Sequence, residues 1–280
     1  MDNIKRKLVQ IITLISTNGY LKGFFEGHIY KGKTKSICVP GLNCYSCPGA
    51  LGSCPIGSLQ AVIADMKFKF SSYVVGFLAL IGITMGRFVC GWLCPFGLIQ
   101  ELLYKIPLPK LKLSKKFDVL KYLKYLILIL FVILLPMFWV NEVGIGKPTF
   151  CKYICPAGTL EGGIPLVLLD NSLKSAIGFL FTWKVTLLII TIILSIIIFR
   201  PFCKFICPLG AIYSLFNPIS IYRFEIDKGA CTNCGACSRK CKMNVTVNKN
   251  SNSLECIRCG ECKGVCPHNA IKILPMRKKD

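Results

Sequence analysis

Cysteine is the residue with the most chemical potential in this chain, and 18 of the 280 residues are cysteines. Eight of them form two runs near the C-terminus with one shared spacing, C-x-x-C-x-x-C-x-x-x-C. Such runs favour iron–sulfur ligation by thiolates. A structural zinc site usually takes two pairs of ligands, and disulfides would not explain the duplicated spacing. The runs are Cys231, Cys234, Cys237 and Cys241, then Cys256, Cys259, Cys262 and Cys266.

This spacing is that of bacterial two-cluster ferredoxins, in which the fourth cysteine of each run ligates the cluster of the other run. The tight part of each run wraps one cluster, and the distant thiolate crosses over to complete the partner cluster. Two 4Fe-4S clusters and a role in electron transfer are therefore predicted. Cluster I takes Cys231, Cys234, Cys237 and Cys266, and cluster II takes Cys256, Cys259, Cys262 and Cys241.

A second cysteine phrase, C-P-x-G, recurs in the preceding two thirds of the chain. Proline is favoured at the first position of a helix, so the cysteine before it is predicted to cap the helix N-terminus. There the free N–H groups and the helix dipole favour an anionic thiolate. One cysteine pair supplies half the ligands of a cluster, with a disulfide inside each pair as the alternative. The pairs are Cys90 and Cys94, Cys151 and Cys155, and Cys203 and Cys207, with a related segment at 38–54.

Hydrophobic residues make up 53% of the chain. Residues 70–86, 125–140 and 185–199 are long apolar runs without charge. About 20 residues cross a bilayer, so with their flanks these runs predict three membrane spans. Trp139 and Trp183 stand where an aromatic belt would lie. Residues 8–25 predict either a fourth span or an amphipathic helix in the membrane interface.

The alternation of spans predicts which pairs meet. The 90/94 and 203/207 pairs should lie on the side of the C-terminal runs, and the 151/155 pair opposite, with two N-terminal cysteines. Cys47 and Cys54 are preferred because each precedes a proline; alternatively Cys38, Cys44, Cys47 and Cys54 hold a cluster of their own. Two clusters, or three, are thus expected in the membrane half. Four clusters leave two thiols for a fifth, incompletely ligated cluster or a redox pair.

The formal charge of +22 comes from Lys and Arg in loops beside the spans. It predicts contact with anionic lipid and docking of an acidic electron carrier, such as flavodoxin or ferredoxin, rather than nucleic acid. Near the cysteine pairs, Arg87, Lys152, Arg200 and Lys204 should offset the negative charge of clusters. Gln100, Glu101 and Glu161 follow the cysteine phrases, either at the edge of a quinone pocket or as solvated helix starts.

Over about residues 70–270 the chain resembles the membrane-bound polyferredoxins of the NapH/NosR/CcoG group. The resemblance rests on Cys90/Cys94, Cys203/Cys207 and the eight C-terminal cysteines. It implies electron transfer between quinol or cytoplasmic donors and a reductase or assembly partner. The chain departs from the pattern at the 151/155 pair, at the segment 38–54, and at Lys242, which replaces a usual proline.

We therefore predict a membrane all-α protein with three to four transmembrane helices and a C-terminal α+β ferredoxin-like domain holding two clusters. Residues 1–65 form an N-terminal helix and cysteine-rich segment, 66–220 the transmembrane domain, and 221–280 the ferredoxin domain. We expect a multi-pass protein of the cell membrane with its ferredoxin domain in the cytoplasm.

The predicted role is that of an electron-transfer component rather than a stand-alone enzyme. Electrons would pass from a cytoplasmic low-potential donor to an extracytoplasmic redox protein or a quinone. One alternative is a quinone-linked dehydrogenase subunit of a NapH-like system. The other is a metal-reducing assembly factor of the CcoG type.

Overall fold

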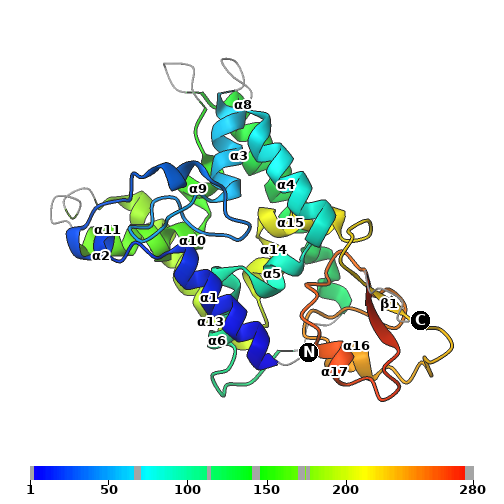
Figure 1. The fold of residues 1–280 in the computed structure, drawn as a ribbon. Helices are drawn as coiled ribbons and strands as arrows, with labels where there is room; N and C mark the ends of the chain where they lie inside the picture. Colours follow the sequence, from blue (N-terminus) through cyan, green and yellow to red (C-terminus); the bar gives the residue numbers. More distant parts are fainter. Residues whose placement is uncertain are drawn as a thin grey trace.

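The computed structural model describes residues 3–65, 71–111, 115–140, 146–169, 174 and 177–274. Residue 70 of the first predicted span and the end of the C-terminal domain lie outside these residues. The described chain is mostly helical, with one two-stranded sheet near the C-terminus (Figure 1). Short helices that begin at C-P phrases gather near its centre, and the C-terminal domain lies to one side of them.

Helix α1 (Asn3–Thr17) ends just before Asn18-Gly19, and α2 (Lys22–Glu26) follows after a turn. A short 3-10 turn, η1 (Lys33–Ser36), leads into the cysteine-rich segment. The single helix that a span over 8–25 requires is therefore not formed. Helix α1 buries Arg6 and Gln10 instead, and its apolar side chains point outward.

Four helices begin directly after a C-P cysteine. The cysteine is the N-cap residue and the proline occupies the first helical position, as the sequence predicts. The first cysteine of each pair lies on a short preceding helix. The C-P helices are α3 (Pro55–Ala64), α6 (Pro95–Leu103), α10 (Pro156–Gly158) and α15 (Pro208–Phe216); the short ones are α5 (Phe88–Trp92), α9 (Thr149–Tyr153) and α14 (Pro201–Phe205).

Two of the described helices are long and apolar enough to cross a membrane: Phe117–Phe138, with 22 residues, and Phe179–Ile197, with 19. The second is α13. The first joins η2 (Lys115–Tyr122), α7 (Leu123–Ile127), η3 (Leu128–Leu134) and α8 (Leu135–Phe138). Helix α4 (Ser72–Met85) has 14 residues, so the span around it stays a prediction.

The middle of the first long helix, η3, widens into π-helical turns. Pro136 has no N–H, so it cannot make the regular bond back to the preceding turn. The Thr149 hydroxyl donates to the Phe131 carbonyl over 2.6 Å and adds a partner from outside the helix. A helix with such an inserted donor departs from regular α geometry. A second π-helical stretch, η4 (Thr159–Gly163), joins α10 to α11 (Ile164–Leu169).

The long helices have two distinguishable ends. Arg87, just after α4, and Lys124, near the start of α7, both pair with Glu255 of the C-terminal domain. At the other end, Trp139 after α8 stacks on Tyr153 with ring centroids 6.1 Å apart. Trp183 near the start of α13 donates to the Tyr153 carbonyl over 3.1 Å. One end of these helices therefore lies at Glu255 of the C-terminal domain, and the other lies at Tyr153.

The C-terminal domain contains the only strands among the described residues. Strands β1 (Arg223–Ile226) and β2 (Ile271–Leu274) pair antiparallel, with Phe224 opposite Ile273. Two short helices, α16 (Ala236–Lys240) and α17 (Glu261–Gly264), each follow the first two cysteines of a run. Phe224, Ile257 and Ile271 are buried in this domain.

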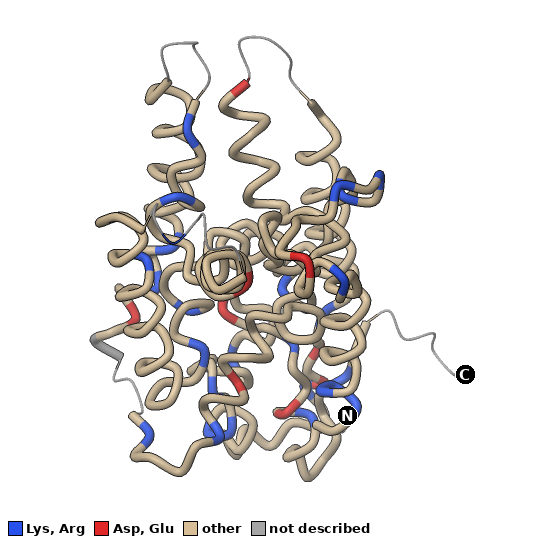
Figure 2. Tube along the Cα trace, turned by 90° about the vertical axis from the view of Figure 1, so that its left-hand side faces the viewer, with Lys and Arg blue, Asp and Glu red and all other residues tan. Residues whose placement is uncertain are grey.

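Apolar side chains cover much of the helix surface. On α1 they recur at every third or fourth position, where Ile4, Leu8, Ile12 and Ile15 are all more than half exposed. Ile189, Ile190 and Ile193 are exposed on α13. The helices that rise to the top of Figure 2 carry few charges. Contiguous apolar surface of this extent marks an interaction with lipid or protein.

Candidate iron–sulfur sites

The first site lies in the C-terminal domain, where the loop before α16 folds around a small cavity. The loop backbone can curl this tightly because Gly235 adopts a left-handed conformation. Cys266, from the other end of the domain, closes the same cavity. The cysteines around it are Cys231, Cys234, Cys237 and Cys266, the set predicted for cluster I.

The second site is another small cavity, and the two cavities in this domain are equal in size. Gly260 provides the left-handed residue here, in the position that Gly235 has in the first loop. Lys242 lies on the wall, so the usual proline is replaced without loss of a thiol from the site. The cysteines are Cys241, Cys256, Cys259 and Cys262, the set predicted for cluster II.

The third site lies between the N-termini of α6 and α15 in the membrane half. All four of its cysteines are buried. The Cys94 thiol lies within electrostatic range of Cys203 and Cys90, and Cys207 within range of all three. The structure therefore brings together the predicted set of Cys90, Cys94, Cys203 and Cys207.

The fourth site is a wide cavity of about 710 Å³ bounded by α3, α9 and α10. Cys151 and Cys155 line it, as expected for this pair. Their N-terminal neighbours are Cys54, as predicted, and Cys44. Cys47 was preferred over Cys44, but it does not line the cavity.

Cys47 is a buried residue near Lys35 and Cys44, and its own loop amides at Gly49 and Ala50 donate to its sulfur. The proline after it does not begin a helix, in contrast to the prolines after Cys54, Cys94, Cys155 and Cys207. Cys38 lies apart from the cavity beside the Ser53 hydroxyl, at 3.9 Å. These are the two surplus thiols, and no set composed of all four N-terminal cysteines is formed.

The C-P-x-G phrase has a common local geometry at these sites. At Cys207 the amide of the glycine three positions later, Gly210, donates to the cysteine sulfur over 3.4 Å. The glycine also leaves room for what faces it. A Cβ on Gly158 would lie 3.6 Å from the Cys44 sulfur, and one on Gly57 would lie 3.9 Å from the Cys151 sulfur.

The residue six positions after each capping cysteine reaches across to a neighbouring loop. The Gln60 and Gln100 carbonyls accept the backbone N–H groups of Phe150 and Phe202, at 2.9 and 3.2 Å. A carboxylate oxygen of Glu161 accepts the Cys44 N–H at 2.6 Å. At the same position in α15, the Tyr213 hydroxyl donates to the Pro40 carbonyl at 3.0 Å.

Gln100 is 1% exposed and Glu101 5% exposed, so they are not solvated helix starts. Neither residue lines the described cavities. Sequence reasoning missed the role of Gln60 altogether. The signal was present, because C-P-x-G-x-x-Q occurs twice, at 54–60 and at 94–100.

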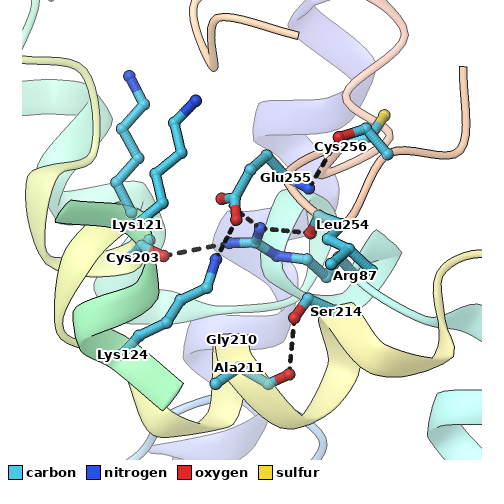
Figure 3. A network of polar contacts seen from close by, with 12 residues as sticks. Arg87, Lys121, Lys124, Cys203, Gly210, Ala211, Ser214, Leu254, Glu255 and Cys256 are labelled. Atoms are coloured by element: carbon cyan, nitrogen blue, oxygen red, sulfur yellow. Dashed lines mark hydrogen bonds and ion pairs between the residues drawn. The ribbon is translucent and has the colours of Figure 1, made fainter. Parts of the chain in front are cut away.

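Two buried arginines flank the third site, as the sequence suggests. The Arg87 guanidinium donates to the Cys203 carbonyl at 3.1 Å and pairs with Glu255 at 2.9 Å. Lys124 pairs with the same carboxylate (Figure 3). Burial raises the pKa of Glu255, but Arg87 and Lys124 outweigh that effect and hold the pKa below its usual value. This carboxylate fixes the C-terminal domain to two helices of the membrane half.

The second arginine, Arg200, donates to the Cys90 carbonyl and pairs with Glu101 at 2.9 Å. Arg6 of α1 pairs with the same carboxylate at 2.6 Å. Lys204 is also buried and donates to the Lys242 carbonyl beside the second site. Lys152, in contrast, is exposed. The cations that sequence reasoning placed near the clusters are thus mostly buried structural partners.

The third site touches the second through two loops. A Cβ on Gly91 would overlap the carbonyl oxygen of Ile257. Each residue follows a cysteine of its site, Cys90 and Cys256. The Trp92 indole donates to the Arg258 carbonyl at 3.1 Å and holds the two loops together.

The third and fourth sites share the segment 40–44. A Cβ on Gly41 would lie 3.1 Å from the Cys94 Cα. The backbone amide of Leu42 lies beside the Cys94 sulfur, and the backbone amide of Asn43 lies beside the Cys54 sulfur. Adjacent peptide groups therefore contact a cysteine of each site.

The donor sets fit 4Fe-4S clusters. Burial raises the pKa of Cys94 to about 12 and that of Cys54 to about 11, so these thiols need cationic iron to become thiolate ligands. The side-chain amide of Asn43 lines the fourth cavity, fully buried, with neither polar atom bonded to protein. Among the described residues no three His, Cys, Asp or Glu side chains are gathered as for a single ion. A zinc site would need its ligand atoms gathered closely around one ion, because Zn–S bonds are about 2.3 Å long.

Comparison with known proteins agrees with these sites. A family described as a 4Fe-4S binding domain matches residues 53–73, 72–117, 123–164 and 180–223, which together exceed half of the chain. A second family with the same description matches residues 252–272. The four repeated matches contain the C-P helices in turn. No solved structure matches the chain.

Several curated proteins are similar. The protein MJ0750 of Methanocaldococcus jannaschii is 30% identical over 72% of this chain and 78% of its own. The putative electron transport protein YccM of Escherichia coli is 24% identical over 75% of this chain and 56% of its own. The ferredoxin-type protein NapH of Haemophilus influenzae is 25% identical over 72% of this chain and 66% of its own. With its repeated cysteine phrases and two ferredoxin runs, the chain belongs to the 4Fe-4S binding domain family of polyferredoxin-type electron transport proteins.

Proposed function

We propose that this iron–sulfur electron-transfer protein carries electrons across the cell membrane through four clusters in series. The order is cluster I, cluster II, the third site and the fourth site. The ligands of the third site are Cys90, Cys94, Cys203 and Cys207. Those of the fourth are Cys44, Cys54, Cys151 and Cys155, so Cys44 takes the place first given to Cys47.

The observation that carries this proposal is the unbroken chain of contacts between sites. Cys241 and Cys266 each cross from one ferredoxin loop to the other cavity. Gly91 and Ile257 join the second site to the third, and the segment from Gly41 to Asn43 joins the third to the fourth. Each junction involves a ligand cysteine or its direct neighbour. Each electron transfer would therefore cross only the contact between two ligand loops.

A bound 4Fe-4S cluster supplies a one-electron redox centre at each site. The protein's own residues hold these centres and set their surroundings. The Cys207 sulfur accepts a hydrogen bond from the Gly210 amide, which stabilises negative charge on that sulfur. Arg87 and Arg200 place fixed positive charge beside the third site, and its full burial excludes water. Hydrogen bonds, charge and burial are the factors by which a protein sets cluster potentials.

The membrane setting is supported by the two long apolar helices and by the outward apolar faces of α1 and α13. The two ends of the helices also differ. Glu255 ties one end to the ferredoxin domain, whereas Trp139, Trp183 and Tyr153 gather at the other end, near the 151/155 pair. We infer a multi-pass protein with clusters I and II on the cytoplasmic side and the fourth site towards the opposite face.

Electrons would enter at cluster I from a low-potential carrier. Cys234 is exposed there, and Arg239 and Lys240 on the adjoining helix α16 are exposed as well. A cationic rim around an exposed ligand suits an acidic protein such as flavodoxin or ferredoxin, because opposite charges speed productive encounters. An extracytoplasmic redox protein or a quinone would accept the electrons.

Sealed liposomes provide the test. Anaerobically purified protein is inserted, an impermeable electron acceptor is trapped inside, and an impermeable low-potential donor is added outside. The acceptor should become reduced without added quinone, and empty liposomes should leave it oxidised. If the acceptor stays oxidised in liposomes whose protein carries all four clusters with outward-facing cluster I, the transmembrane route is wrong.

One observation favours a second candidate, a quinone-linked redox subunit. The fourth cavity is about 710 Å³, far larger than the cluster cavities of the C-terminal domain, and Ala61, Ala64 and Leu166 lie on its wall. Part of that space would suit an apolar ring next to a cluster. In the same liposomes, this candidate predicts reduction of the acceptor only after quinone is added.

A further inference from the structure

Gln60 occupies a defined position beside the fourth site. It is 0% exposed, and its amide nitrogen Nε2 lies 3.1 Å from the sulfur of Cys151. Its carbonyl oxygen Oε1 accepts the backbone N–H of Phe150, the residue before that cysteine, at 2.9 Å. One side chain therefore holds both the backbone and the sulfur of a ligand loop.

Gln100 repeats this arrangement beside the third site. It is 1% exposed, its Nε2 lies 3.2 Å from the sulfur of Cys203, and its Oε1 accepts the Phe202 N–H at 3.2 Å. Both glutamines also donate to the carbonyl four residues earlier in their helices. Two independent sites thus contain the same arrangement of glutamine amide, cysteine sulfur and backbone groups.

The orientation of each amide follows from chemistry. A backbone N–H can only donate, so the atom facing it must be the glutamine oxygen. The NH₂ group then faces the sulfur and donates to it. A thiolate ligand accepts such a bond, and the bond becomes stronger when the cluster gains an electron and its sulfurs become more negative.

The other two helices place different residues at this position. Glu161 meets a backbone N–H, and the Tyr213 hydroxyl meets a carbonyl, so neither donates to a sulfur. Each membrane-half site therefore contains one such side-chain donor, and in each case it comes from the earlier of the two C-P helices. This regularity separates the glutamines from ordinary buried polar residues.

We propose that Gln60 and Gln100 are matched positioning residues, each of which donates to one ligand sulfur and thereby raises the reduction potential of its cluster. The inference rests on the proposed function, because it assumes clusters at the third and fourth sites. Its basis is the paired geometry of amide, sulfur and backbone. Neither residue is a ligand, so its removal should change the potential without removing iron.

The variants Gln60→Met and Gln100→Met keep the side-chain length and remove the donor. EPR-monitored redox titration should show that Gln60→Met lowers the reduction potential of one cluster. Gln100→Met should lower the reduction potential of a different cluster. We expect at least a tenfold change in the reduction equilibrium, which is about 59 mV for one electron. Each variant serves as the control for the other, because Gln60 donates to a sulfur of the fourth site and Gln100 to a sulfur of the third.

Full iron content with unchanged potentials in both variants would overturn the inference. Wild-type protein with clusters in the ferredoxin domain alone would instead refute the proposed function.

If a variant does not fold, an experiment on the wild-type protein still tests whether the glutamine amides donate to the clusters. Its only glutamines are at positions 10, 60 and 100, so side-chain ¹⁵N-glutamine labelling reports on few nuclei. Pulsed EPR should detect a coupled amide nitrogen at two distinct reduced clusters, and its absence at both would sink the idea.

Discussion

Gly91 lies against the carbonyl oxygen of Ile257, and there is no space between them for a Cβ. Gly91 follows Cys90 of the third site, and Ile257 follows Cys256 of the second. A glycine is required here because two ligand loops meet backbone to backbone.

Replacing Gly91 by alanine should push these loops apart. Overpacking of a tight contact costs about 1–3 kcal/mol, and here the displacement would widen the gap that an electron must cross. We expect slower reduction of the third cluster after rapid reduction of cluster II, as measured by stopped-flow spectroscopy. Gly76→Ala is the control, because no atom lies within 4 Å of a Cβ at that position. Equal rates in Gly91→Ala and wild type would exclude this junction as the route.

Glu255→Gln should loosen the ferredoxin domain. The substitution leaves Arg87 and Lys124, both fully buried, without their negative partner. Loss of one member of a buried ion pair typically costs about 3–5 kcal/mol. Thermal unfolding should occur at a lower temperature, and protease should cut the C-terminal domain sooner.

Asp118→Asn offers a surface comparison for that variant. Asp118 pairs with Lys121 at 2.5 Å, but its side chain is 52% exposed. Exposed pairs contribute about 0–1 kcal/mol, so this variant should resemble wild type. If the two variants were equally stable, Glu255 would not fix the domain in place.

Much of this arrangement follows from the sequence because ligand spacing is a local property. The C-P phrase determines a capped helix start, and the ferredoxin spacing determines which cysteine crosses over. The choice of Cys44 over Cys47 could not be predicted in this way. It depends on the path of the loop after Cys38, where Glu161 holds the Cys44 amide from a helix 117 residues away in sequence.

The N-terminal helix shows a different limit. Its apolar residues suggest a span, but the polar residues that interrupt them, Arg6 and Gln10, have partners on α5 and α6. Periodicity alone does not reveal that a helix buries its polar face and exposes its apolar one.

The attachment of α1 should depend on pH through Glu101. Burial raises the pKa of this carboxyl, but Arg200 and Arg6 outweigh burial and hold the pKa below its ordinary value. A carboxylate with a lowered folded-state pKa stabilises the fold fully above the unfolded value of about 4.3 and loses that effect as pH falls through the folded value. The stability difference between wild type and Glu101→Gln should be constant from about pH 7 to 5 and shrink below about 4.3. A difference that grew on acidification would contradict this assignment.

Cysteine variants distinguish the ligands of the fourth site from the surplus thiols. Cys44 lines the cavity with Cys54, Cys151 and Cys155, whereas Cys47 does not. Cys44→Ser should therefore lose one cluster's share of iron and one EPR signal, because serine is a poor replacement for a thiolate ligand of iron. Cys47→Ser, three residues away and also buried, should keep the iron content of wild type and serves as the matched control. The opposite result, with iron lost from Cys47→Ser alone, would restore the assignment made from the C-P sequence and would require the loop 44–50 to rearrange around the cluster.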